Sequence, residues 1–558
     1  MKKQPYHKED YIVPLYRTFP EFLDGMDATF GDRPALSWFT RREEEKGYTY
    51  HEMVERVRAL RESLCRRQMS KAHIAIVSEN SAEWILVFLA AAACGSTAVC
   101  VDGEQSDESI RDMLRRAEVR MVFLSQTYLD ICKPLLQEGC VEEIVVMDSY
   151  AEETPGISAL QTLHDQGRAW LDAGEDSAAG LQVDEEQTVE IVFTSGTTSR
   201  SKMVMLSQRA VMQNLCDSTQ YVCFYKTVFC SLPFYHAYGL NCAVLNSFLR
   251  GAHLYINGNL RTTMRDLHLA QPDTMLAVPL MLEVIHNQIW LNAERAGKAG
   301  SLRKLMKLST LGRKVGLSIG RGTLDGIREK ALGNLRLIIS GGAHLSREIA
   351  EELDLLGVQV LQGYGISECA PLISVNCNYA NKMGSVGLPL PSMEVRLVQE
   401  EVWVKGPSVM QGYYNEPDQT AEAMEDGWFK TGDLGYQDKD GFLYLTGRKK
   451  NLIVFKNGKK VSPERLENML SPIPLVKEVV VYGTVNGSAA DDVKLTASIY
   501  PDPERTKGMS SFEVLDLLQK EINQINTELP TYQQIQMVTI REKEFAKTGT
   551  KKIKRYAE

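Results

Sequence analysis

Apolar strand-like and helix-like segments alternate through the first two-thirds of this 558-residue chain. Strand-like runs at 73–78, 96–101 and 119–124 are separated by helix-like segments at 81–94 and 106–117. This alternation indicates βαβ units around a mainly parallel sheet, because a parallel connection needs a crossover of helix length. The chain also exceeds what one hydrophobic core supports, so we expect at least two or three structural units.

The pattern changes from Gly384 onward. Short β-type runs at 394–398, 402–405 and 441–445 are separated by Gly and Pro, which predicts a small twisted β unit. Beyond Arg448 a compact segment of about 110 residues remains, near the low end of domain size. The expected fold class is α/β: a large N-terminal region of two βαβ-type subdomains plus the small twisted β unit, followed by a small α+β C-terminal domain.

Composition excludes several classes of protein. A hydrophobic content of 44% with 24% charged residues is typical of soluble globular proteins, and a net charge of −9 disfavours a nucleic-acid partner. The longest apolar run, 84–94, is shorter than the roughly 20 residues of a transmembrane helix, so we interpret it as a buried helix. The first residues lack a signal peptide and no C-x-x-C pair occurs, so reduced thiols and a cytoplasmic location are expected.

A stretch rich in Ser, Thr and Gly follows the apolar run 189–193. It reads Thr-Ser-Gly-Thr-Thr-Ser-Arg-Ser-Lys over 194–202. Hydroxyl groups, backbone N–H groups near a glycine and a lysine suit an oligophosphate, whose oxygens are acceptors. The Gly-Lys-Ser/Thr of the common phosphate loop is absent, and on its own an ordinary connection explains such a stretch equally well.

Four further stretches follow in the chain. They read Ser-Gly-Gly-Ala at 340–343, Gly-Tyr-Gly-Ile-Ser-Glu at 363–368, Gly-Trp-Phe-Lys-Thr-Gly-Asp-Leu-Gly at 427–435 leading to Gly-Arg-Lys-Lys-Asn at 447–451, and Lys-Thr-Gly-Thr-Lys-Lys-Ile from 547. In this order they resemble the adenylate-forming superfamily of acyl-CoA synthetases, nonribosomal peptide adenylation domains and beetle luciferases. The resemblance implies an N-terminal AMP-binding domain at 1–447, a hinge at 448–451 and a mobile C-terminal domain at 452–558.

The resemblance assigns most motif residues to ATP. Gly342 and Ala343 would lie against the adenine opposite Tyr364, while Asp433 would accept the ribose hydroxyls beside Arg448. Taken singly, each has an ordinary explanation as a turn, core or surface residue. The nucleotide-binding residues implied are Thr194, Ser195, Gly196, Thr197, Thr198, Lys202, Gly342, Ala343, Gly363, Tyr364, Gly365, Asp433 and Arg448.

Further roles concern catalysis and movement. The resemblance makes Glu368 and Ser367 catalytic residues that hold Mg²⁺ with the phosphates, since Mg²⁺ prefers hard oxygen ligands. Lys552 would stabilise the charge that develops on the α-phosphate during adenylation. Lys450 occupies the hinge position, and Gly458 would allow a thin thiol arm to approach closely in the CoA tunnel.

The implied reaction has two steps. A carboxylate oxygen is a poor leaving group, so the acid attacks the α-phosphorus of ATP, releases pyrophosphate and becomes an acyl-adenylate. A thiol then displaces AMP. The implied cofactors are ATP, Mg²⁺ and CoA, or the phosphopantetheine of a carrier protein in place of CoA.

The chain departs from the superfamily pattern at several positions. The usual phosphate loop reads T-S-G-T-T-G-x-P-K-G, whereas this chain has Ser199, Ser201 and Met203 in place of the second glycine, the proline and the last glycine. Lys551 replaces the glycine that normally precedes the catalytic lysine. We expect adenylation to be retained but slower, and the changes leave a weakly active or non-catalytic nucleotide-binding homologue open.

The acid is indicated by four positions. His236 and Tyr238, in an aromatic segment, resemble the acyl-pocket wall of acyl-CoA synthetases, and Gly341 and Gly365 complete the expected substrate pocket. Small-acid enzymes carry a tryptophan at the position of Gly365, so this glycine suggests room for a longer tail. The basic helical segment 301–333 is similar to its counterpart in long-chain fatty acyl-CoA synthetases, although a solvated amphipathic surface explains it equally.

A medium- or long-chain fatty acid is therefore the predicted substrate, with ATP and CoA as the other small molecules. The alternatives are an aryl-acid:CoA ligase and a ligase that loads an acyl carrier protein. No transmembrane segment is expected, and transient contact with a membrane to fetch a lipid stays open.

Overall fold

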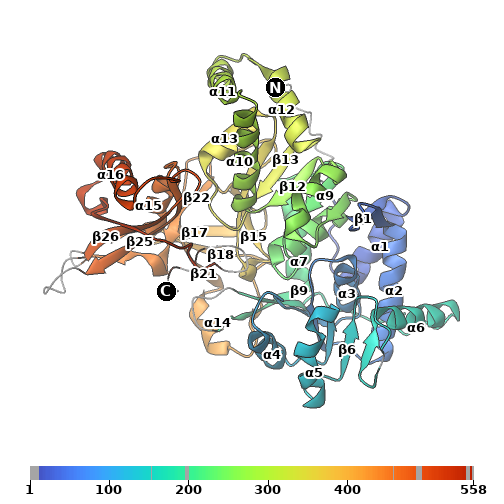
Figure 1. The fold of residues 1–558 in the computed structure, drawn as a ribbon. Helices are drawn as coiled ribbons and strands as arrows, with labels where there is room; N and C mark the ends of the chain where they lie inside the picture. Colours follow the sequence, from blue (N-terminus) through green and yellow to red (C-terminus); the bar gives the residue numbers. More distant parts are fainter. Residues whose placement is uncertain are drawn as a thin grey trace. The chain divides into compact units, whose positions relative to one another are not determined.

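The computed structural model describes residues 12–152, 154–194, 200–455, 458–485, 493–547, 553 and 555. Contacts divide the chain into two compact units. The first comprises Met1–Glu394 and Val404–Phe429, and the second comprises Val395–Trp403 and Lys430–Glu558. Figure 1 shows the elements along the chain, and each unit is described by itself below.

Two large sheets form the framework of the first unit, and their strands confirm the expected α/β fold class. The eight-stranded sheet has the order β19 (Gly412–Tyr413), β9 (Met203–Ser207), β8 (Thr188–Phe193), β4 (Thr97–Cys100), β3 (His73–Val77), β5 (Met121–Leu124), β6 (Glu143–Val146) and β7 (Ile157–Ala159). From β8 to β7 all neighbouring strands are parallel. The βαβ units predicted between 73 and 124 are therefore confirmed.

The nine-stranded sheet gathers strands from distant parts of the sequence. Its order is β16 (Leu388–Pro389), β15 (Leu372–Val375), β14 (Gln359–Gly365), β13 (Leu337–Ser340), β12 (Thr274–Ala277), β10 (Thr227–Cys230), β11 (His253–Ile256), β1 (Pro34–Phe39) and β2 (Glu45–Thr49). The central strands run parallel, so the segments that follow β13 and β14 meet at one edge of this sheet.

Helices surround these sheets in the first unit. The interpretation of the apolar run 84–94 as a buried helix is confirmed, because every residue from Trp84 to Cys94 is buried. This helix begins after Ser81, whose side chain accepts a hydrogen bond from the N–H of Trp84. The helices are α1 (Phe19–Phe30), α2 (Tyr50–Arg66), α3 (Ala82–Ala93), α4 (Asp107–Arg116), α5 (Leu129–Gln137), α6 (Leu160–Asp172), α7 (Gln208–Thr219), the π-helix η3 (Tyr238–Leu245), α8 (Asn246–Leu249), α9 (Thr263–Ala270), α10 (Pro279–Arg295), α11 (Ala299–Lys314), α12 (Arg321–Leu332), α13 (Arg347–Leu355) and α14 (Pro417–Ala423).

Most of the predicted small β unit belongs to a five-stranded sheet. Its strands are β17 (Glu394–Val398), β18 (Glu401–Lys405), β20 (Met424–Glu425), β21 (Trp428–Gln437) and β22 (Leu443–Arg448). In the second unit β21 and β22 pair antiparallel, with Asp433 opposite Arg448. Division of the chain at 447, with a hinge after it, stays a prediction.

The rest of the second unit is a small α+β structure with its own core. Helices α15 (Pro463–Leu470) and α16 (Ser511–Thr527) accompany the hairpin β23 (Ile453–Val454) and β24 (Lys460–Val461) and the three-stranded sheet β25 (Val476–Val485), β26 (Val493–Pro501) and β27 (Met537–Ile540). Leu466, Leu518 and Ile522 are buried in this core. Across the described residues, no helix combines the length and the apolar character needed to cross a bilayer.

Candidate functional site

The predicted phosphate loop begins and ends on two paired strands of the first unit. Thr194 follows β8, Lys202 precedes β9, and the N–H of Thr194 donates to the carbonyl oxygen of Lys202 at 3.0 Å. Ser195, Gly196, Thr197 and Thr198, together with Ser199, lie outside the described residues. The structure therefore places both ends of the loop.

The second half of this loop is anchored to α4. Arg116 donates to the carbonyl oxygen of Ser201 at 2.9 Å, and Arg200 pairs with Asp112 at 2.6 Å. Ser201 stands where the superfamily pattern has proline, which would restrict the backbone. In this chain the contacts that Arg116 and Arg200 make between α4 and the loop hold this part of the loop instead. Met203, in place of the last glycine, is the first residue of β9 and is buried.

Tyr413 connects the predicted phosphate-binding lysine to the predicted Mg²⁺ ligand. The Nζ atom of Lys202 lies 4.4 Å from the centre of the Tyr413 ring. On the other side, the Tyr413 hydroxyl donates to Oε1 of Glu368 at 2.9 Å. Burial, reinforced by the Glu368 charge, raises the pKa of Tyr413, so the phenol keeps its proton. Tyr413 lies outside every motif that the sequence offers, so it was not predicted as a site residue.

Replacing Tyr413 with phenylalanine is expected to lower kcat/KM for ATP about tenfold, which corresponds to the lower end of the about 1.5–3 kcal/mol that a hydrogen bond to a charged group contributes. Steady-state pyrophosphate release measures this effect. Tyr414 provides the matched control, since its hydroxyl bonds instead to Glu118 at 2.8 Å. Equal loss in Tyr413→Phe and Tyr414→Phe would contradict a specific role for the bond to Glu368.

The predicted adenine-binding residues lie at the ends of two adjacent strands. β13 and β14 pair with Ser340 opposite Gln362, so Gly342, just after β13, and Tyr364, near the end of β14, each lie two residues beyond this pair. Gly342 has a φ of +84°, which only glycine adopts readily, while Ala343 is exposed. Tyr364 is buried within β14, beside Gly363. The structure thus brings these residues to one edge of the sheet, and their contact with a base stays a prediction.

Two residues of the predicted acyl pocket meet at the same edge. A Cβ on Gly341 would lie 3.1 Å from the ring of Tyr238, so this glycine lets the ring approach the backbone. The Tyr238 hydroxyl donates to the carbonyl oxygen of Ile339 at 2.9 Å. His236 is nearby in sequence and partly buried, burial lowers its pKa, and its buried Nε2 has no hydrogen-bond partner among the described residues.

Gly365 has a different explanation from the one expected. A Cβ at this position would lie 2.2 Å from the carbonyl oxygen of Pro371, and the N–H of Ile366 donates to that same oxygen at 2.9 Å. The close approach of two backbone segments therefore requires glycine here. This approach explains the glycine by itself, so room for a longer acyl tail at Gly365 stays a prediction.

A buried carboxyl group lies at the start of the phosphate-loop hairpin. Glu190 of β8 is fully buried, and its Oε1 accepts from Nδ2 of Asn241, in η3, at 2.8 Å. Burial raises the pKa of Glu190 to about 7, although the bond from Asn241 opposes the shift. Within the described residues, neither Oε2 of Glu190 nor Oδ1 of Asn241 has a partner.

Glu190→Gln is expected to stabilise the protein at pH 8 by about 3 kcal/mol and to have little effect at pH 5. The folded state, with a pKa of about 7, keeps a proton that the unfolded state, near 4.5, releases. Stability of the wild type therefore falls as pH rises between those values, and glutamine removes this fall. Thermal unfolding of both proteins at the two pH values measures the difference.

Glu62 supplies the control for this comparison. It is equally buried, but bonds from Arg66 and Ser177 outweigh the effect of burial and lower its pKa. Glu62→Gln should therefore destabilise the protein at pH 8. A Glu190→Gln protein that is also less stable at pH 8 would show that Glu190 is ionised in the folded state.

The predicted ribose contacts lie in the second unit. Nε of Arg448 lies 2.8 Å from Oδ1 of the buried Asp433, which joins the two residues across β21 and β22. Lys450 lies in the exposed turn that follows. Gly458 is exposed with a φ of +76°, a conformation that favours glycine. Lys552 and its neighbour Lys551 lie outside the described residues.

The residues around Glu368 fit a Mg²⁺ ion that arrives with a nucleotide. No group of three or more His, Cys, Asp or Glu side chains that could hold a metal occurs in the described part of the chain. Mg²⁺ in such sites needs one or two carboxylates, with phosphates and water as its other ligands. Glu368, in the short turn Ser367–Cys369, meets that need, and a role of Ser367 as a second ligand stays a prediction.

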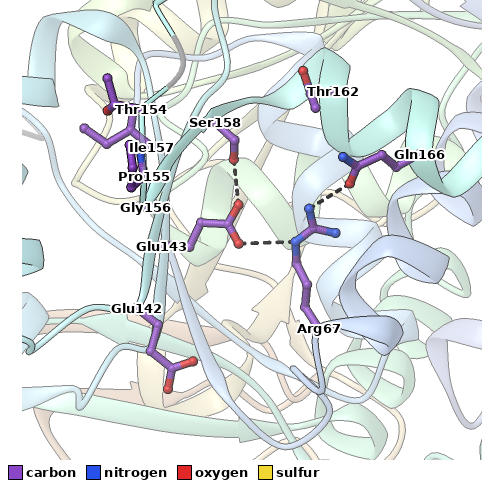
Figure 2. A pocket seen from close by; sticks show the side chains of 10 residues that line it. All are labelled: Arg67, Glu142, Glu143, Thr154, Pro155, Gly156, Ile157, Ser158, Thr162 and Gln166. Carbon is purple, nitrogen blue, oxygen red and sulfur yellow. Dashed lines mark hydrogen bonds and ion pairs between the residues drawn. The ribbon is translucent and has the colours of Figure 1, made fainter.

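One cavity lies away from these residues. It has a volume of about 600 Å³, is in the first unit and is shown in Figure 2. Its polar groups are bonded to each other: Arg67 pairs with Glu143 at 3.2 Å and donates to Gln166 at 2.9 Å, and Ser158 donates to Glu143 at 2.6 Å. No motif residue lines this cavity.

Comparison with protein families decides the class of the chain. The AMP-binding enzyme family matches residues 25–414, and the AMP-binding enzyme C-terminal domain matches residues 450–557. The chain belongs to the AMP-binding enzyme family. The resemblance to adenylate-forming enzymes is thereby confirmed, as is the expectation of an AMP-forming acid–thiol ligase. Enzymes of this class use ATP.

Named relatives of this AMP-binding enzyme include fatty-acid ligases. The long-chain-fatty-acid–CoA ligase FadD15 of Mycobacterium bovis is 29% identical over 458 residues, covering 78% of this chain and 74% of the relative. Long-chain-fatty-acid–CoA ligase 1 of Homo sapiens is 28% identical over 453 residues, covering 74% and 63%. The crystal structure of the anthranilate CoA ligase AuaEII with anthranoyl-AMP aligns with a TM-score of 0.77 at 17% identity over 98% of this chain and 97% of that chain, which shows a shared fold.

Proposed function

We propose that this AMP-binding enzyme activates a medium- or long-chain fatty acid as acyl-AMP, with release of pyrophosphate, and then transfers the acyl group to CoA with release of AMP. The observation that carries the proposal is the similarity, over most of the chain, to relatives named long-chain-fatty-acid–CoA ligases. The two family matches, to the AMP-binding enzyme and to its C-terminal domain, together cover residues 25–414 and 450–557.

The first unit would bind the phosphates through its loop and Glu368. Lys202 would neutralise phosphate oxygens from the end of the loop, while Glu368 would hold Mg²⁺, which supplies positive charge next to the phosphates. Tyr413 bonds to Glu368 and contacts Lys202, which supports a role in orienting both groups. Adenine would lie against Gly342 and Ala343.

The other motif residues complete the proposal. Asp433 and Arg448 would contact the ribose, and their ion pair supports a shared position. Lys552 would stabilise the α-phosphate in the first step, and the residues around Gly458 would admit the thiol arm of CoA in the second. Rotation at Lys450 would separate the two steps.

The acyl pocket is proposed at His236, Tyr238 and Gly341. A partly buried histidine whose pKa is lowered stays uncharged, which suits an apolar ligand. The partly buried Tyr238 ring packed on Gly341 supports the same assignment. These features favour an apolar acid without fixing its length.

Release of AMP and pyrophosphate, measured across straight-chain and aryl acids with and without CoA, tests the proposal. We expect AMP release that requires CoA and reaches its highest kcat/KM with long straight-chain acids. A higher kcat/KM with aryl acids would indicate that the substrate is an aryl acid and not a fatty acid. Pyrophosphate release without thioester formation would indicate an acyl carrier protein as acceptor. ATP binding without turnover for any acid would overturn the enzymatic proposal.

A further inference from the structure

The outward side of α11 carries large apolar residues where a surface helix normally carries polar ones. Leu308 is 51% exposed, Leu311 is 60% exposed and Val315, directly after the helix, is 72% exposed. Their spacing of three and four residues places them on one stripe of the helix. In Figure 1, α11 lies with α10 and α12 at the outer end of the first unit.

The opposite side of α11 is already used by the core. Leu302, Met306 and Ser309 are buried there, and the first two pack in the cluster that includes Leu353 of α13. Because the helix has a separate buried stripe, the exposed apolar residues are not needed to attach it to the protein. A contiguous exposed apolar patch of this kind marks an interaction surface.

The segment after α11 extends the patch and is held in place by backbone bonds. The N–H of Leu317 donates to the carbonyl oxygen of Gly312 at 2.8 Å, and the N–H of Gly316 donates to that of Arg313 at 3.2 Å. With a φ of +77° at Gly316, this is a Schellman end to the helix. Leu317 is nevertheless 58% exposed, so the fixed backbone presents it to solvent.

Lysines flank these apolar residues. Lys304, Lys307 and Lys314 fall on the same stripe as Leu308 and Leu311, and all three are exposed. Residues 298–321 contain no Asp or Glu, although the whole chain has a net charge of −9. We call Lys304, Lys307, Leu308, Leu311, Lys314, Val315 and Leu317 the basic apolar face.

We propose that the basic apolar face docks on an anionic lipid surface. Leucine side chains would enter the boundary between headgroups and acyl chains, while the lysine stems extend so that their ammonium groups meet lipid phosphates. A second copy of the chain fits less well, because a two-fold contact would bring together two faces that both carry positive charge. The docking requires no particular acid substrate, so it stands apart from the proposed function.

Cosedimentation of the full chain with lipid vesicles, without ATP or acid, tests the proposal. We expect binding to vesicles of mixed phosphatidylglycerol and phosphatidylcholine and little binding to phosphatidylcholine alone. Raising the ionic strength from about 0.1 M to about 1 M should weaken the binding. Leu308→Ser/Leu311→Ser should lower the binding constant about tenfold or more, and Lys304→Glu/Lys307→Glu/Lys314→Glu should lower it about a hundredfold.

Phe512 and Lys507 supply matched controls, since both are exposed in the second unit and lie outside the face. Phe512→Ser and Lys507→Glu should bind as the wild type does. The proposal is overturned if anionic vesicles do not bind the wild type, or if the face variants bind as tightly as the controls. It is also overturned if sedimentation velocity shows a dimer that Leu308→Ser/Leu311→Ser abolishes, since the face would then contact a second copy.

Discussion

Lys552→Ala is expected to slow acid-dependent pyrophosphate release about a hundred- to a thousandfold. A positioned cation that meets charge developing in the transition state has an effect of this size, because it stabilises the transition state more than the bound substrate. The residue is singled out by its place in the Thr-Gly-Thr-Lys-Lys-Ile stretch. Pyrophosphate release under saturating ATP and acid measures the loss.

The two half-reactions separate this role from a general loss of structure. When synthetic acyl-AMP and CoA are supplied, Lys552→Ala should still form thioester, because the α-phosphate has already been attacked. The neighbouring Lys551→Ala is the matched control and should retain adenylation. Normal pyrophosphate release in Lys552→Ala would remove this lysine from the adenylation step.

Glu368→Gln is expected to lower the same rate about a hundredfold and to raise the Mg²⁺ concentration needed for half-maximal activity. Glutamine keeps the size of the side chain and an oxygen that can accept from Tyr413, but it loses the charge that attracts the ion. A titration of pyrophosphate release against Mg²⁺ measures both effects. Tyr413→Phe removes only the hydrogen bond to Glu368. The difference between the rate losses of the two variants therefore measures the effect of the missing charge.

Glu348 provides a control for this substitution, since it is an exposed glutamate on α13 of the same unit. Glu348→Gln should leave the Mg²⁺ titration unchanged. An unaltered Mg²⁺ requirement in Glu368→Gln, even with a reduced rate, would exclude this carboxylate as a ligand of the ion.

Local patterns were sufficient to predict much of the fold. The alternation between 73 and 124 predicted the βαβ units because strand and helix periods are properties of neighbouring residues. The order of the motifs predicted that Asp433 and Arg448 act together, and the β21–β22 hairpin places them opposite each other. Short sequence separation makes such pairs predictable.

Features that depend on distant segments could not be predicted in this way. Tyr413 reaches Lys202 because β19 pairs with β9, with Tyr413 opposite Val204, and no local pattern specifies that pairing. Gly365 was interpreted from the residue type at its position, whereas the deciding neighbour is the backbone of Pro371. Glu190 resembles any polar residue in a strand until its burial against η3 is known.

The strand pairings also determine when each sheet can be completed as the chain is synthesised. β1 pairs with β11 through Leu36 and Leu254, so the first strand has no partner on that side until β11 has left the ribosome. The outer edge of β9 has no partner until β19, which contains Tyr413, has been synthesised. Fragments that stop before β19 should therefore expose an open strand edge and aggregate, so that the phosphate-loop sheet is not separable as an independent piece.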